Sequence, residues 1–117
     1  PSPMNGSAIW LSGIELCVFG KKPGAPFNLH CQNTVLRYPC GTNKIHPTQK
    51  PVELMRQLVL ASSQIGGVIF DPFMGSGTTA IAAIREKRNF IGFELNKEYY
   101  DKACKRIKLE QAQLTLF

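Results

Sequence analysis

A glycine-rich stretch in the second half of the chain has residue types that suit nucleotide binding. Residues 75–80 have the sequence GSGTTA, which satisfies the pattern GxGxxG/A. Glu94 follows Gly75 by nineteen residues, which is where a dinucleotide fold places a carboxylate that accepts hydrogen bonds from ribose hydroxyls. Glycine lets the backbone approach a ligand closely, and charge-assisted hydrogen bonds are worth roughly 1.5–3 kcal/mol each. The spacing therefore predicts an adenosine-binding loop with a ribose carboxylate.

A second acid, Asp71, stands just before this loop and bears on which nucleotide would bind. A carboxylate beside a pyrophosphate would be repelled by it, whereas the ammonium and sulfonium groups of S-adenosylmethionine would be attracted. Asp71 therefore favours S-adenosylmethionine over NAD. The loop also lacks the lysine of a GxxxxGK[ST] phosphate loop, which argues against an ATPase.

These residues need strands and helices to position them. Hydrophobic periodicity and turn residues predict a helix over 51–63, a strand over 68–71, a helix over 78–87 and a strand over 90–94, and Asn96 is expected to cap a last helix. Strand, helix and strand in this order form a right-handed crossover with parallel strands, so the predicted fold class is α/β. Ligands of such sheets bind at the carboxyl ends of the strands, where Asp71 and Glu94 are expected.

The first part of the chain is less regular. Residues 14–19 (IELCVF) alternate well enough to predict another strand, and residues 20–45 predict a long loop, the kind that often serves binding. Four potential zinc ligands occur in or near this loop, but their spacings fit no common zinc pattern: His30, Cys31, Cys40 and His46. No metal site is predicted, and the cysteines are expected to be reduced thiols.

Composition describes one folded domain over residues 1–117, with 44% hydrophobic and 19% charged residues. The net charge is +6, and most of the excess lies in the first 50 residues. That part contains a single acid, Glu15, and five bases: Lys21, Lys22, Arg37, Lys44 and Lys50. This asymmetry favours a polyanionic partner, although solubility alone would also explain it. No apolar run is long enough to span a bilayer, so we expect a cytoplasmic protein without a membrane partner.

Three segments together resemble a known family. Residues 46–51 (HPTQKP), 71–79 (DPFMGSGTT) and 93–94 (FE) are similar to the amino-group DNA methyltransferases, which modify N6 of adenine or N4 of cytosine, in their β-type order. The resemblance implies a Rossmann-like, three-layer αβα fold with a mostly parallel sheet, the cofactor S-adenosyl-L-methionine and double-stranded DNA as partner. Residues 46–117 would be the cofactor-binding βαβα core, and residues 1–45 a basic strand and loop segment.

The resemblance also assigns cofactor roles to individual residues. Asp71 would lie near the methionine end of the cofactor, and Glu94 would hold the ribose. Thr48, Gln49 and Lys50 would close over the methionine moiety, with Lys50 or the N-terminus of the helix suited to its carboxylate. The cradle would consist of Phe73, Gly75, Ser76, Gly77 and Thr78. His46 is expected to stabilise its loop. Ile91 and Phe93 are expected in the core, although one apolar neighbour must cover the adenine.

One part of the family pattern is absent from the sequence. The catalytic motif of the family is Asp, Asn or Ser followed by Pro-Pro and an aromatic residue, and it receives the flipped base. No Pro-Pro pair occurs in these 117 residues, so no catalytic residue is assigned. We expect the C-terminal part of a larger methyltransferase, inactive alone, whose sheet edge pairs with the missing N-terminal catalytic half or with a second copy.

Other functions stay open at this point. The chain could be a non-catalytic nucleic-acid-binding module that uses the basic side chains of its first half, in which case binding would fall steeply with salt. It could also be a degenerate methyltransferase remnant. A dinucleotide oxidoreductase is disfavoured because Asp71 opposes the phosphates.

Overall fold

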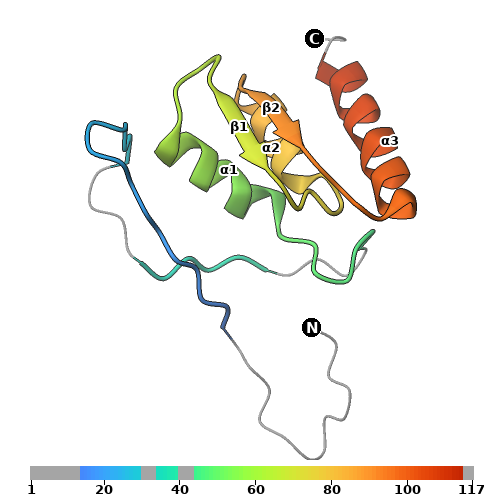
Figure 1. Ribbon diagram of the computed structural model, residues 1–117, viewed down its shortest axis with the longest axis horizontal. Coiled ribbons are helices and arrows are strands. Elements are labelled where there is room, and N and C mark those ends of the chain that lie inside the picture. The colour runs from blue at the N-terminus through green and yellow to red at the C-terminus, as the bar shows by residue number, and fades with distance from the viewer. Residues whose placement is uncertain (1–13, 30–33, 40–43, 115–117) are drawn as a thin grey trace, which may run out of the picture.

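The computed structural model describes residues 14–29, 34–39 and 44–114. In chain order they form helix α1 (Val52–Ser62), strand β1 (Val68–Asp71), helix α2 (Thr78–Arg85), strand β2 (Asn89–Gly92) and helix α3 (Lys97–Leu114) (Figure 1). This confirms the predicted order of elements from residue 51 onward. The second strand ends at Gly92 rather than Glu94, so Glu94 lies in the connection to α3.

The two strands pair in parallel, as the βαβ crossover predicts. Val68 lies opposite Asn89, and Asp71 lies opposite Gly92, so both strands end at the same edge. The ladder continues one residue beyond β2, where the Phe93 amide donates to the Asp71 carbonyl at 3.1 Å. This arrangement confirms the α/β class with a parallel sheet.

Helix boundaries follow local sequence signals. The predicted cap at Asn96 is confirmed, because its Oδ1 accepts a hydrogen bond from the Tyr99 amide at 3.1 Å. After α1, Gly66 adopts a left-handed backbone with φ of 78°, which allows the chain to turn into β1. None of the helices that the structure describes is both long enough and apolar enough to cross a membrane.

The core is centred on α2. This helix lies against both strands, and α1 and α3 pack against it (Figure 1). Its small and branched side chains are almost fully buried: Ala80, Ile81, Ala82 and Ala83. Val59 of α1 and Ala103 of α3 are buried as well, so part of the buried apolar surface lies between helices.

The opposite face of the sheet is open. Ile69 and Phe90 on the α2 side are half-buried, whereas Phe70 is 61% exposed and Phe93 is 60% exposed. Ile91 is exposed as well, so placing Ile91 and Phe93 in the core was wrong. Of the three αβα layers expected, the described residues supply the sheet and the helices on one side.

The predicted strand over residues 14–19 is wrong. These residues have no regular secondary structure, and Leu16 and Val18 are 92% and 97% exposed. A strand needs a neighbour to complete its hydrogen bonds, and this segment runs past α1 without entering the β1–β2 sheet (Figure 1). Alternation of apolar residues is therefore not sufficient to form a strand in this segment.

Asn28 anchors the first part of the chain to the C-terminal end of α1. Its side-chain amide donates to the carbonyls of Leu60 and Ser63, both at 2.8 Å, and its backbone amide donates to the Ala61 carbonyl at 2.7 Å. Arg88 adds a bond from its guanidinium to the Ser63 carbonyl at 2.8 Å. The carbonyls at the C-terminal end of α1 therefore accept hydrogen bonds from Asn28 and Arg88, which belong to two segments distant in sequence.

An ion pair joins α2 to α3. Arg85 Nε lies 2.6 Å from Glu110 Oε1, and the Glu110 side chain is only 13% exposed. The hydrogen bond from Arg85 lowers the pKa of Glu110. The carboxylate therefore stabilises the fold above the ordinary glutamate pKa, about 4.3, and this stabilisation is lost as the pH falls through the lower pKa of the folded chain.

We predict that Glu110→Gln lowers the free energy of unfolding by about 1 kcal/mol at about pH 7 and has little effect at about pH 2.5. Urea denaturation at the two pH values measures the difference. Glu98→Gln is the control, because its pair with Lys102 is exposed to solvent and should change little at either pH. Equal losses at both pH values for Glu110→Gln would mean that the ion pair is not the cause.

Candidate cofactor site

The glycine loop between β1 and α2 turns sharply at two glycines. Gly75 and Gly77 have φ values of 54° and 77°, which L side chains rarely adopt. The Gly77 amide donates to the Met74 carbonyl at 2.9 Å, and the Met74 amide donates to the Phe93 carbonyl at 2.8 Å. The loop is therefore attached to the chain that leaves β2, beside the carboxyl ends of both strands.

Asp71 is the last residue of β1 and faces the loop. Its Oδ1 accepts a hydrogen bond from the Phe73 amide at 3.0 Å, and its Oδ2 accepts one from the Thr79 hydroxyl at 2.6 Å. The carboxylate thus joins the strand end to the first turn of α2. A carboxylate can accept about four hydrogen bonds, so acceptor capacity remains for a cationic ligand group.

Glu94 is bonded directly to the glycine loop. Its Oε2 accepts a hydrogen bond from the Gly75 amide at 2.9 Å, and its Oε1 accepts one from the Asn96 amide at 2.8 Å. Glu94, which the nineteen-residue spacing predicted to lie near Gly75, therefore makes direct contact with it. Each oxygen keeps a lone pair that can accept from a ribose hydroxyl.

The C-terminal part of the loop is polar yet buried. Ser76 and Thr78 are almost fully inaccessible, and their hydroxyl oxygens lie 3.1 Å apart. Arg106 of α3 donates from Nη1 to the Ser76 carbonyl at 3.1 Å and to Thr78 Oγ1 at 3.2 Å. Sequence reasoning missed Arg106, although its position one turn after Ala103 could have placed it on the buried face of α3.

Residues 46–49 lie next to the glycine loop. A Cβ added to Gly75 would lie 3.9 Å from the His46 ring, and that ring lies 4.3 Å from the ring of Tyr99, centroid to centroid. His46 Nδ1 accepts a hydrogen bond from the Thr48 amide at 3.2 Å. Gln49 Oε1 accepts one from the Ile45 amide at 3.0 Å. Thr48 and Gln49 therefore hold the shape of their own segment beside the loop.

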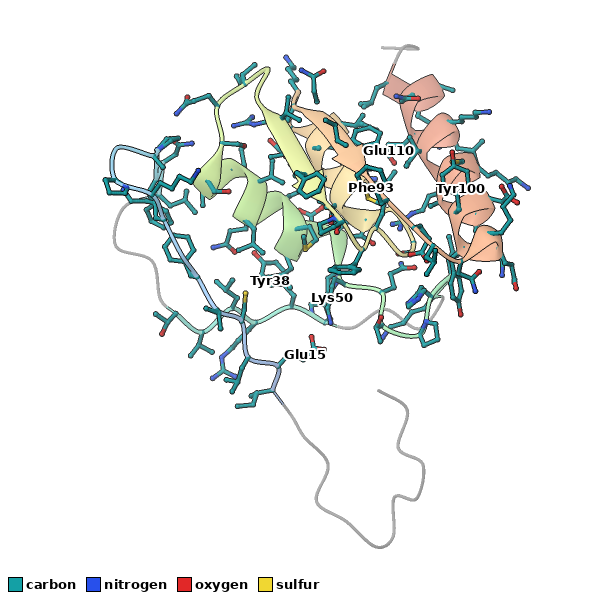
Figure 2. The ribbon with its side chains drawn as sticks, viewed as in Figure 1. Glu15, Tyr38, Lys50, Phe93, Tyr100 and Glu110 are labelled. Atoms are coloured by element: carbon teal, nitrogen blue, oxygen red, sulfur yellow. The ribbon has the colours of Figure 1, made fainter. Side chains whose placement is uncertain are left out.

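Lys50 already has a partner from the first part of the chain. Its Nζ lies 2.7 Å and 2.8 Å from the two carboxylate oxygens of Glu15, and both side chains are exposed (Figure 2). The pair lowers the pKa of Glu15. A ligand carboxylate would have to share this ammonium group with Glu15.

Apolar side chains surround the strand ends on the open side. Phe73 is 87% exposed, Leu95 is fully exposed, and the rings of Phe70 and Phe93 meet edge to face with centroids 6.1 Å apart. Exposed aromatic rings beside polar groups are suited to cover a flat, partly apolar ligand.

Most of the residues proposed for the cofactor thus converge on one place. The structure brings together the two carboxylates, the loop and the aromatic at its start: Asp71, Glu94, Gly75, Ser76, Gly77, Thr78 and Phe73. Thr48 and Gln49 lie in the neighbouring segment, and Lys50 pairs with Glu15. Among the described residues no group of three or more metal-ligating side chains occurs; His30, Cys31 and Cys40 lie outside them.

Comparison with known proteins matches the chain to DNA methyltransferases. The family model N6_N4_Mtase, described as DNA methylase, matches residues 5–105. The chain is 51% identical over 65 residues to the type II methyltransferase M2.DpnII of Streptococcus pneumoniae, covering 56% of this chain and 24% of that protein. It is 44% identical over 72 residues to the DNA adenine methyltransferase YhdJ of Escherichia coli K12, covering 62% of this chain and 24% of that protein.

Solved structures show the same likeness. The structure of M1.HpyAVI with S-adenosylmethionine superposes with a TM-score of 0.61 at 39% identity, covering 71% of this chain and 44% of that chain. The cytosine-N4-specific PvuII DNA methyltransferase gives a TM-score of 0.51 at 33% identity, covering 54% of this chain and 22% of that chain. The chain spans about a quarter of the length of the two relatives above.

Proposed function

Because the chain belongs to the N6_N4_Mtase family of DNA methylases, we propose that it forms the S-adenosylmethionine-binding part of an enzyme that methylates N6 of adenine or N4 of cytosine in duplex DNA. The hydrogen bond from the Gly75 amide to Glu94 is the observation that carries the proposal. It joins the glycine loop and the ribose carboxylate at the carboxyl ends of parallel strands, where ligands of α/β sheets bind.

The residues of this site fit the proposed cofactor chemically. Two carboxylates, Asp71 and Glu94, stand beside the loop, and the loop contains no lysine. Such a set attracts an ammonium group and accepts from ribose hydroxyls, whereas it repels a pyrophosphate. S-adenosylmethionine supplies, when bound, a methyl group on a sulfonium centre that an exocyclic amine can attack.

Each part of the site has a separate task in this proposal. Asp71 orients the amino acid end, Glu94 holds the ribose, and exposed aromatic rings such as Phe73 cover the adenine. Residues 46–49, of which His46 lies beside Gly75, close over the methionine end of the cofactor. The base-receiving segment with its Pro-Pro-aromatic motif is not part of this sequence, so we propose that methyl transfer needs a further segment.

The open face of the sheet is where we place that further segment. Val68, Phe70 and Ile91 present an apolar surface of the kind that packs against another element. A second copy of the chain could occupy the same face. Methyl transfer to duplex DNA by the complete gene product, measured with cofactor labelled on its methyl group, tests the proposed reaction.

Asp71→Asn tests the role of the first carboxylate. We predict that it lowers the affinity of the chain for S-adenosylmethionine by about tenfold or more, because a neutral amide gives up the charge that attracts the ammonium group. Calorimetric titration measures the change. Asp101→Asn is the matched control, since this acid lies on the exposed side of α3 paired with Lys97. Unchanged affinity in Asp71→Asn would remove Asp71 from the site.

A further inference from the structure

One face of α3 packs directly against the glycine loop. A Cβ added to Gly77 would lie 3.3 Å from the Cβ of Ala103 and 3.4 Å from Cδ1 of Ile107. These two side chains are four residues apart, so they share one face of the helix, and Arg106, one turn after Ala103, lies beside that face. The glycine backbone at this point lets α3 come close enough for Arg106 to reach the loop.

Arg106 bridges the two residues that flank Gly77. A single nitrogen, Nη1, donates to the Ser76 carbonyl at 3.1 Å and to Thr78 Oγ1 at 3.2 Å, with Ser76 Oγ at 3.5 Å as a third acceptor. Gly77 between them has a left-handed backbone. The bridge therefore spans the residue at which the loop turns into α2, and it holds the peptide group between Ser76 and Gly77 in one orientation.

Electrostatics make this a costly place for a cation. The N-terminal end of α2 carries the positive end of the helix dipole, which repels a guanidinium. Burial lowers the pKa of Arg106, although an arginine stays charged at any ordinary pH. Among the described residues no carboxylate lies within ion-pair distance of the guanidinium, and the negative charge of Glu110 opposes the lowering of its pKa. The neutral acceptors of the loop and the charge of Glu110 together offset the cost. An apolar side chain would fill the same space without that cost.

We infer that Arg106 is a positioning residue for the proposed cofactor site. Glu94 holds the loop at Gly75, and Arg106 holds it on the far side of the turn, at Ser76 and Thr78. When ribose hydroxyls share the oxygens of Glu94, the Arg106 bridge keeps the loop in its binding shape. This inference rests on the proposed function, because the ligand that benefits is S-adenosylmethionine.

Two measurements on the 117-residue chain test the inference. Arg106→Met keeps most of the aliphatic stem and removes the donors, while Arg106→Lys keeps the charge. Lys105→Met is the matched control, since it removes a cation from the exposed side of the same helix. Hydrogen exchange of the Gly77 amide reports on the loop, and the Phe93 amide, bonded to the Asp71 carbonyl, reports on the sheet.

Arg106→Met is expected to speed exchange at Gly77 about tenfold while Phe93 changes little, and to weaken S-adenosylmethionine binding about tenfold in calorimetry. Arg106→Lys should recover part of both losses, and Lys105→Met should behave as wild type. Equal acceleration at Gly77 and Phe93 would show general destabilisation and overturn the inference, as would unchanged affinity in Arg106→Met. If the wild-type chain binds no S-adenosylmethionine, the proposed function fails. The exchange rates at Gly77 and Phe93 then still show whether Arg106 holds the loop.

Discussion

Glu94→Ala is expected to lower the affinity of the chain for S-adenosylmethionine by about 100-fold or more, because it removes an acceptor for two ribose hydroxyls and charge-assisted bonds are worth roughly 1.5–3 kcal/mol each. The same substitution leaves the amides of Gly75 and Asn96 without their acceptor. The loop would therefore lose its contact with the chain after β2 in addition to its ribose ligand.

Glu94→Gln separates these two effects. The amide oxygen can still accept from one of the two backbone amides, but the amide nitrogen cannot replace the second carboxylate oxygen. We expect an affinity between those of the wild type and Glu94→Ala. Glu98→Ala on the exposed side of α3 serves as the control for loss of a negative charge. Wild-type affinity in Glu94→Ala, measured by calorimetry, would show that Glu94 is not the ribose carboxylate.

Gly77→Val is expected to lower the free energy of unfolding more than any other substitution in the glycine loop. A left-handed backbone costs an L residue about 1–2 kcal/mol, and crowding in a packed site adds about 1–3 kcal/mol. The added side chain would press on Ala103 and Ile107, which lie within 3.4 Å of the new Cβ. Because α3 would be displaced, we also expect weaker cofactor binding.

Gly66→Val provides a matched comparison. Gly66 has nearly the same φ, 78°, but nothing lies within 4 Å of a Cβ added there. Gly66→Val should therefore lower the free energy of unfolding only by the cost of the left-handed backbone, about 1–2 kcal/mol. Urea denaturation of both variants isolates the packing contribution as their difference. Equal losses of unfolding free energy would contradict the close approach of α3 to the loop.

The C-terminal part of the fold was predictable because its signals are local. Asn96 caps α3 through an amide only three residues away, and glycines mark the turn into α2. The nineteen-residue spacing from Gly75 to Glu94 predicted that these two residues form one site, because a βαβ crossover brings those positions to one sheet edge.

What could not be predicted depends on partners distant in sequence. Residues 14–19 alternate like a strand, yet a strand forms only where another strand offers its free edge. Phe93 looks like a core residue, but its burial depends on a layer that the described residues do not provide. Arg106 reaches the loop only because α3 packs against the loop at Gly77. The periodicity of α3 indicates which face is buried, but not which segment that face contacts.

Titration of the 117-residue chain with S-adenosylmethionine, and in parallel with NAD, tests the central claim most directly. We predict a saturable one-site heat for S-adenosylmethionine that disappears in Glu94→Ala, and no heat for NAD, because the carboxylate of Asp71 beside the loop would repel a pyrophosphate. Binding of NAD together with indifference to S-adenosylmethionine would contradict the claim.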